Sequence, residues 1–270
     1  MFEGLYNSAT GMISQSVVQK VIATNIAKAV LPGYKKQTAV QSPFQDELAK
    51  HSEQVGGTKV KQIYTSFTQG SIKQTNNPLD IAVTGDGFFV VHTKNSSTTR
   101  AYEDDVIEGT ARTENSQYSY TRNGRLSISQ DGVLVTLDGY PVMGENGEIS
   151  IRGGGEDLAG SHQVIIDKNG QVSIQQDNQS RVIDTLRVVD FKEYTKVTPI
   201  GNSLFDAGDQ TPVAAENFSV EQGFIEQSNV SILDEMVSMI SNMRLYESNQ
   251  KALRSISESL QRSIAEIGRV

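Results

Sequence analysis

A run of apolar residues spaced by seven closes the sequence and constrains the fold more than any other feature. Its members are Ile232, Met239, Tyr246, Leu253, Leu260 and Ile267, and Met236, Met243 and Ile264 add positions four residues after members of the run. Strict sevens predict a long helix that pairs with a second helix, because a helix packed on a sheet follows a period of 3.6. At ~1.5 Å per residue the rod would measure roughly 55 to 60 Å and overhang a compact domain. Ser228 or Asn229 is expected to cap its start.

The first thirty residues carry a weaker helical seam with steps of four and three. Its small or apolar members are Leu5, Ala9, Met12, Ala23, Ile26 and Val30. Ser16 and Gln19 occupy the middle positions, so the helix is only weakly apolar. Pro32 and Gly33 follow, and they predict that the helix ends near Val30. This seam is the natural partner of the C-terminal one, in the same chain, in a neighbouring copy, or in both.

The middle of the chain changes to a period of two with frequent turn dipeptides, which indicates a β-rich body. The dipeptides are Asn123-Gly124, Asp131-Gly132, Asp138-Gly139, Asn146-Gly147 and Asn169-Gly170, and each predicts a hairpin turn. "LDIAV" and "FFVV" predict a further hairpin about residues 84–87. The polar segments 41–60 and 94–117 are expected to be a linker and a variable loop.

These patterns together predict an α+β fold in which long N- and C-terminal helices pair as a coiled-coil-like stalk beside a mainly β central domain. The expected division is 1–40 for the N-terminal helix and exit segment, 41–222 for the β-rich domain and 223–270 for the heptad helix. The alternative, in which both helices pack on the sheet of one α+β domain, is favoured by composition alone and disfavoured by the strict sevens.

Charge and hydropathy exclude several classes of partner. The 270 residues contain no cysteine and carry a net charge of −8, which argues against a nucleic-acid partner. No apolar run approaches the ~20 residues needed to cross a bilayer, so membrane insertion is not expected. The first residues, "MFEGLYNSATGMISQ", show no basic and apolar leader pattern, and a cleaved signal peptide is not expected.

The sequence offers no catalytic constellation, so we expect a protein that is not an enzyme and uses no cofactor or metal. The three histidines, His51, His92 and His162, lie in polar settings without metal-ligand spacing. Neither "GDGFF" nor "GGG" completes a phosphate-binding motif, and no G-x-S-x-G elbow is present.

Four stretches resemble the axial rod and hook proteins of the bacterial flagellum. They are "NIAKAVLPGYKK", "QTNNPLDIAVTGDGFFVV", "YTRNGRLSISQDGVLVTLDGYPVMG" and "QGFIEQSNVSILDEMVSMISNMRLYESNQKAL". The residues that carry the family signature are Asn25, Gly33, Tyr34, Asn77, Pro78, Leu79, Asp80, Gly85, Gly87, Phe88 and Phe89. Within this family, "YTRNG" and "GYPVMGENGEI" are most similar to the proximal rod protein, and the distal rod protein is a close second.

The resemblance implies a structural subunit of the basal-body rod in the cell envelope or periplasmic region. It implies export through the flagellar type III apparatus and helical polymerisation with copies of itself and with other rod and hook subunits. In such proteins the terminal helices pair as an inner tube around the export channel, so Pro32-Gly33 would be the exit from the tube. The seam residues named above are then the expected assembly contacts, and both ends should be weakly ordered before assembly.

Two alternatives remain open from sequence alone. A distal rod or hook subunit shares the same design, and a β-rich surface adhesin with a coiled-coil stalk belongs to another class. Tyr34, Lys35 and Lys36 either dock the exit segment on the β domain or form a solvated loop.

Overall fold

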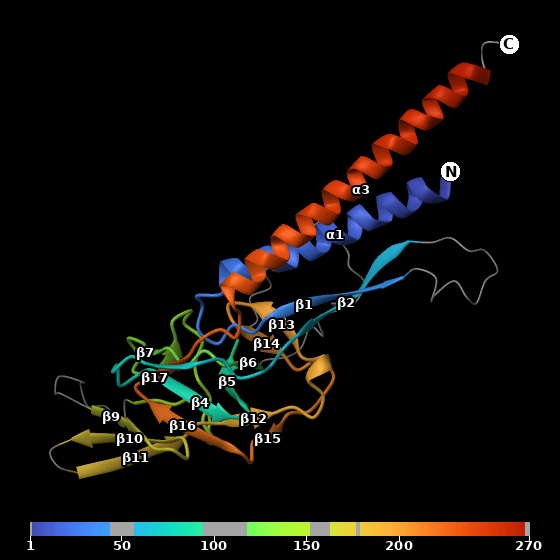
Figure 1. Cartoon of the computed structure of the whole chain (residues 1–270). Helices are drawn as coiled ribbons and strands as arrows, with labels where there is room; N and C mark the ends of the chain where they lie inside the picture. The colour runs from blue at the N-terminus through green and yellow to red at the C-terminus, as the bar shows by residue number, and fades with distance from the viewer. Residues whose placement is uncertain (1, 44–56, 94–117, 152–162, 177–178, 268–270) are drawn as a thin grey trace. The chain divides into compact units, whose positions relative to one another are not determined.

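The computed structural model describes residues 2–43, 57–93, 118–151, 163–176 and 179–267 (Figure 1). Its α+β composition is the predicted one, with one long helix near each end and strands between them. The chain forms two compact units, and each is described by itself. Unit 1 comprises residues 1–29, 36–66 and 230–270, and unit 2 comprises residues 30–35 and 67–229. The segment expected to be a variable loop, 94–117, lies outside the described residues.

The described part of unit 1 contains two helices and one strand pair. These elements are α1 (Phe2–Lys28), β1 (Gln37–Pro43), β2 (Thr58–Thr65) and α3 (Ile232–Ile267). The two helices lie side by side, and β1 and β2 also contact α1. β1 and β2 are antiparallel, with a bulge between Val40 and Gln41. The prediction of a linker over 41–60 is therefore wrong where β1 and β2 occupy it, because polar residues on a strand pair exposed on one face resemble a loop in composition.

The ends of the two helices follow local sequence. α1 ends at Lys28, two residues before the predicted end, and Gly33 adopts a φ of 69°. α3 begins at Ile232, where the Ser231 hydroxyl accepts a hydrogen bond from the Asp234 amide at 3.4 Å. The predicted caps Ser228 and Asn229 lie before this turn, so that prediction is wrong by two or three residues.

Unit 2 is built from short strands in several sheets. Its largest sheet has six strands in the order β13-β14-β6-β5-β12-β15, and β11-β10-β9 form a second sheet. The described residues of unit 2 also form three strand pairs, β16-β4, β17-β3 and β7-β8. The strand bounds are β3 Ile72–Gln74, β4 Ile81–Gly85, β5 Phe88–His92, β6 Tyr118–Thr121, β7 Leu126–Ile128, β8 Leu134–Thr136, β9 Gln163–Ile166, β10 Gln171–Gln176, β11 Gln179–Thr185, β12 Val188–Asp190, β13 Thr198–Gly201, β14 Leu204–Asp206, β15 Val213–Ala214, β16 Phe218–Gln222 and β17 Phe224–Glu226, with a short 3-10 helix at Tyr194–Lys196.

Strand β5 separates two apolar clusters. Phe88 and Val90 belong to a cluster with Phe205, whereas Phe89 and Val91 belong to the larger cluster that also contains Ile81. A strand buried on both faces reads as a continuous apolar run, which explains "FFVV". The core of unit 2 therefore lies on both sides of its main sheet.

Some predicted hairpins are present and others are not. Asp131-Gly132 joins the paired strands β7 and β8, and Asn169-Gly170 joins β9 and β10. Asn123-Gly124 does not turn a hairpin, since β6 pairs with β5 and β14 while β7 pairs with β8. The predicted hairpin of β4 with β5 is also wrong. β4 pairs along its whole length with β16, more than 130 residues away, and β5 joins the six-stranded sheet instead.

Candidate functional site

Small residues on α1 allow α3 to approach closely within unit 1. A Cβ atom on Gly4 would lie 3.2 Å from Ile256 Cδ1, and one on Gly11 would lie 2.9 Å from Asn249 Nδ2. Ser8 and Ser14 are buried on the same helix. The two helices therefore pack through small side chains on α1 rather than through a broad apolar stripe.

Polar side chains also join α1 and α3 by hydrogen bonds, next to the contact of Gly11 with Asn249. Asn242 Nδ2 donates to the Gln15 carbonyl oxygen at 2.9 Å, and Asn249 Nδ2 donates to Gln15 Oε1 at 3.3 Å. Asn242 is buried although it is polar. Gln15 of α1 thus accepts hydrogen bonds from two asparagines that are seven residues apart on α3.

The base of the helix pair is held by a third asparagine. Asn25 pairs with the backbone of Gln37 through two hydrogen bonds of 2.8 and 3.0 Å, as a neighbouring strand would. Its Nδ2 also donates to Glu235 Oε2 at 3.0 Å, and Lys36 Nζ lies 2.6 Å from Glu235 Oε1. Asn25 and Glu235 are both buried. The end of α1, the start of β1 and the first turn of α3 are therefore tied together.

The residues predicted as assembly contacts divide into partly buried and exposed positions. On α1, Leu5, Ala9, Met12 and Ile26 are partly buried and Ala23 is exposed, while Val30 follows the helix and is exposed. On α3, Met239, Leu253 and Leu260 are partly buried. The remaining described members of the α3 set are exposed: Ile232, Met236, Met243, Tyr246 and Ile264. The side chain of Ile267 lies outside the described residues. Their part in assembly stays a prediction.

The outer side of α3 carries an exposed apolar surface, which we call the α3 apolar face. Its members are Leu233, Met236, Val237, Ile240 and Met243. Leu233 is 76% exposed and Val237 is 63% exposed. A contiguous exposed apolar surface on a protein of ordinary composition is typical of a site for another macromolecule. The sequence prediction did not include Leu233, Val237 and Ile240, because it followed the positions spaced by seven from Ile232 and those four residues after them, and these three belong to neither set.

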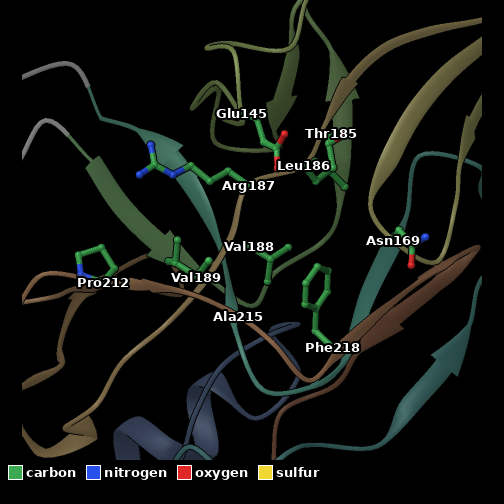
Figure 2. A pocket seen from close by; sticks show the side chains of 11 residues that line it. Glu145, Asn169, Thr185, Leu186, Arg187, Val188, Val189, Pro212, Ala215 and Phe218 are labelled. Carbon is green, nitrogen blue, oxygen red and sulfur yellow. The ribbon is translucent and has the colours of Figure 1, made fainter.

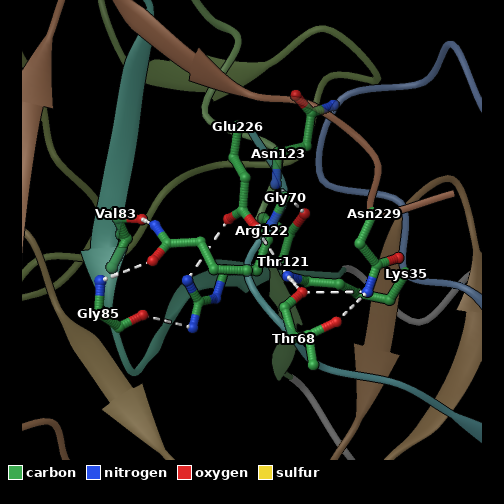
Figure 3. A network of polar contacts seen from close by, with 11 residues as sticks. Lys35, Thr68, Gly70, Val83, Gly85, Thr121, Arg122, Asn123, Glu226 and Asn229 are labelled. Carbon is green, nitrogen blue, oxygen red and sulfur yellow. Dashed lines mark hydrogen bonds and ion pairs between the residues drawn. The ribbon is translucent and has the colours of Figure 1, made fainter. Parts of the chain in front are cut away.

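Unit 2 contains a buried charge cluster formed by Lys35, Arg122 and Glu226 (Figure 3). Lys35 Nζ lies 2.7 Å from Glu226 Oε1, and Arg122 Nη1 lies 3.4 Å from Glu226 Oε2. All three side chains are at most 3% exposed. Burial lowers the pKa of Lys35, and the Glu226 carboxylate opposes that shift.

Backbone groups complete this cluster. Lys35 Nζ donates to the Thr68 carbonyl oxygen at 2.9 Å, and Arg122 Nη2 donates to the Gly85 carbonyl oxygen at 3.0 Å (Figure 3). The Gly70 amide donates to Glu226 Oε1 at 2.8 Å. The cluster fastens the segment that follows α1 to β17, and Tyr34 and Lys35 are buried there, as the docking interpretation requires. For Lys36 that interpretation is wrong, because Lys36 lies in unit 1 and pairs with Glu235. Sequence analysis did not find Glu226, because a lone acidic residue in a strand carries no signal of its partner.

The other signature residues form a turn and a core. Asn77 Nδ2 donates to Asp80 Oδ1 at 3.1 Å, and the Asp80 amide donates to the Asn77 carbonyl oxygen at 3.0 Å. Pro78 and Leu79 lie inside this turn. A Cβ on Gly87 would lie 2.6 Å from Val188 Cγ1, and one on Gly85 would meet the backbone of Asn217. Phe88 and Phe89 are fully buried, so this motif specifies a local fold.

A shallow pocket of about 320 Å³ lies in unit 2 (Figure 2). Leu186, Val188 and Phe218 contribute apolar surface, and the charged residues among its described lining are Glu145 and Arg187. Catalysis needs several polar groups that converge on one point. Within the described residues, this lining presents no nucleophile with a neighbouring base.

No described helix combines the length and hydropathy that a membrane-spanning segment requires.

Comparison with known proteins places these features in one family. Residues 221–266 match the model described as the C-terminal part of the flagellar basal-body rod FlgEFG proteins. Residues 110–174 match the model described as the D1 domain of the flagellar hook proteins FlgE/F/G. Both models describe flagellar axial proteins.

Relatives named "Flagellar basal-body rod protein FlgG" match almost the whole chain. The protein from Borreliella burgdorferi is 30% identical over 281 residues, which cover 94% of this chain and 95% of the relative. The protein from Bacillus subtilis is 29% identical, with 97% of each chain covered. One from Buchnera aphidicola is 28% identical over 97% of this chain and 98% of its own length. The chain belongs to the flagellar basal-body rod protein family.

Within the family, these relatives favour FlgG, the distal rod protein, over the proximal rod protein FlgF that sequence analysis ranked first. That ranking rested on two short stretches, 120–124 and 139–149. Asn and Gly are favoured wherever a backbone turns, so stretches this short and rich in them discriminate poorly between related subunits.

Proposed function

We propose that this chain is a structural subunit that polymerises helically into the flagellar basal-body rod and has no catalytic activity. The α3 apolar face is the single observation that carries the proposal, because α1 does not cover it. Contacts between different surfaces of successive copies build a filament when the rotation between them does not close a ring. Such a polymer would transmit torque and surround the export channel.

The partners follow from this role. They are other copies of the chain and other rod and hook subunits of the flagellum, and the type III export apparatus would deliver the chain. Its place would be the basal body, within the cell envelope or periplasmic region, without insertion into a membrane. The position along the rod is proposed to be distal, in line with the names of the relatives.

The two terminal segments have the inner role in this proposal. Residues 1–40 and 223–270 would form the axial part through coiled-coil-like pairing, and 41–222 would form the outer β-rich part. The partly buried seam residues, such as Leu253 and Leu260, would support pairing within a subunit. The exposed ones, such as Met236 and Met243, would contact a neighbouring copy.

A polymerisation assay with two exposed positions tests the proposal. The double variant Leu233→Gln, Ile240→Gln removes apolar surface from the α3 apolar face without touching a buried side chain. We expect the parent chain to form filaments with rising concentration in sedimentation and electron microscopy, and the double variant to remain monomeric with unchanged thermal unfolding.

The matched control is Leu137→Gln, because Leu137 is 61% exposed but lies in unit 2. This control should polymerise like the parent. Filaments of unchanged yield from the double variant would contradict the proposed role of the α3 apolar face. A closed oligomer from the parent would instead favour the adhesin alternative.

A further inference from the structure

We propose that Gln15, Asn242 and Asn249 are a register device that makes α1 pair with α3 of its own chain in one alignment. These three polar side chains specify which helix α1 pairs with and in which alignment. The α3 apolar face takes no part in this pairing and stays exposed. The reading of the apolar surface as an assembly site rests on the proposed function, whereas the register device does not.

Gln15 can accept hydrogen bonds from both asparagines in only one alignment of α1 with α3. Its carbonyl oxygen accepts from Asn242, and its side-chain oxygen accepts from Asn249. The asparagines stand seven residues apart, so each lies about two turns of α3 from the other. If α3 slips by one heptad along α1, one asparagine takes the position that the other held beside Gln15. The other asparagine then has no acceptor on Gln15.

Burial makes a slipped alignment unfavourable. Asn242 is 7% exposed, and a buried amide without a hydrogen-bond partner loses its interaction with water and gains nothing in return. A single buried asparagine is known to fix alignment and partner number in paired helices at a cost in stability. The same reasoning applies to Asn249, which is partly buried.

The shape of α1 supports the same alignment. Gly11 lies opposite Asn249 and Gly4 lies opposite Ile256, each within contact distance of the place a Cβ would take. These two glycines are seven residues apart on α1, as Asn249 and Ile256 are on α3. A slip of one heptad that brings Gly11 opposite Ile256 also brings Val18 opposite Asn249, where a Cβ would already lie within 3 Å of the amide and a valine would not fit.

The test measures the alignment in the full-length monomer. The chain has no cysteine, so spin labels can be attached at two introduced cysteines, Ser16→Cys on α1 and Ser238→Cys on α3, both at exposed positions. The double variant Asn242→Leu, Asn249→Leu removes the polar contacts and leaves side chains of similar length. Pulsed electron resonance then gives the distance distribution between the labels.

We expect one narrow distance in the parent, and a second population in the leucine variant. A slip of one heptad displaces the labels by ~10 Å along the helix axis. We also expect the leucine variant to associate at concentrations where the parent is monomeric, as sedimentation would show. The matched control Ser248→Leu adds the same apolar side chain at an exposed position of α3 and should change neither result.

One narrow, unshifted distance in a monomeric leucine variant would overturn the proposal. If the double variant does not fold, the same distance measurement is made on the single variant Asn249→Leu. In that variant Asn242 still donates its hydrogen bond to the Gln15 carbonyl oxygen. A parent chain that never polymerises would contradict the proposed function but not this inference, since the distances are read in the monomer.

Discussion

At the scale of single residues, two charged side chains hold the segment that follows α1 in place. Lys35 and Lys36 are consecutive, yet one meets Glu226 in unit 2 and the other meets Glu235 in unit 1. Both glutamates are almost completely buried. A buried charge is tolerated only with a partner and further hydrogen bonds. Each lysine therefore neutralises a different buried glutamate, which explains why the "GYKK" stretch has two consecutive basic residues.

Substitution of Glu226 by Gln should be strongly destabilising. The change keeps the shape of the side chain but leaves Lys35 and Arg122 buried together without a counter-charge. Breaking a buried ion pair in this way costs about 3–5 kcal/mol, which urea unfolding of the full chain would measure.

The control for Glu226→Gln is Glu193→Gln, whose partner Lys196 and own side chain are both more than half exposed. This surface variant should unfold like the parent, because solvent screens exposed pairs. Equal unfolding curves for Glu226→Gln and the parent would show that the cluster contributes no net stability.

Tyr194 gives a prediction about alkaline pH. Burial, followed by its 2.6 Å hydrogen bond to Asp190, raises the pKa of Tyr194 above its ordinary value of 10.0. A raised pKa contributes stability that is complete below the unfolded-state pKa and is lost as the pH rises above it. The stability advantage of the parent over Tyr194→Phe should therefore shrink as the pH rises above 10. Denaturant unfolding of both proteins between pH 8 and 11 would measure this, and a constant difference would refute the assigned cause.

At the scale of elements, the ends of helices depend on residues nearby in the sequence, whereas the partners of helices and strands depend on residues far away in the sequence. The end of α1 follows from Pro32 and Gly33, which are local, and the sequence predicted it within two residues. The long α3 also follows from a local repeat. The face that α3 presents to α1 does not, because Gly4, Gly11 and Gln15 decide it from more than 220 residues away.

Strand pairing shows the same limit more clearly. The segment 81–91 reads as a hairpin because two apolar runs flank a glycine-rich turn, yet β4 and β5 enter different sheets. The competitor for β4 is β16, whose five residues pair with it in unbroken register. Two strands that are close in sequence pair only when no distant strand matches better, and periodicity within one segment carries no information about that competitor.

Gly33 tests how tightly the exit from α1 is specified. Its φ of 69° is costly for other residues, and a Cβ there would lie 2.6 Å from the carbonyl carbon of Arg122. Gly139 has a similar φ of 84° but open space around the same position. Gly33→Ala should therefore destabilise the chain by about 1–3 kcal/mol more than Gly139→Ala, because only Gly33 adds overpacking to the backbone cost. Thermal unfolding of the two variants gives the comparison, and equal losses would mean that the segment moves aside freely.

At the scale of the whole molecule, stability should be uneven. Unit 2 holds two large apolar clusters, whereas the helix pair of unit 1 is joined through small and polar side chains. Regions with little buried apolar surface open at low free energy. The terminal helices should thus be paired in one alignment for most of the time in the monomer and open transiently at low free energy. They should gain most of their stability when the α3 apolar face of one copy is covered by another.

Hydrogen exchange of the full chain, measured in dilute monomer and again in the polymer, shows whether the terminal helices drive assembly. It compares amides in residues 1–40 and 225–270 with those of the buried strand β5. We expect fast exchange at both ends of the monomer and strong protection of the same ends after assembly, while β5 changes little. Ends that are already as protected as β5 in the monomer, or that gain no protection in the polymer, would contradict the claim that the terminal helices drive assembly.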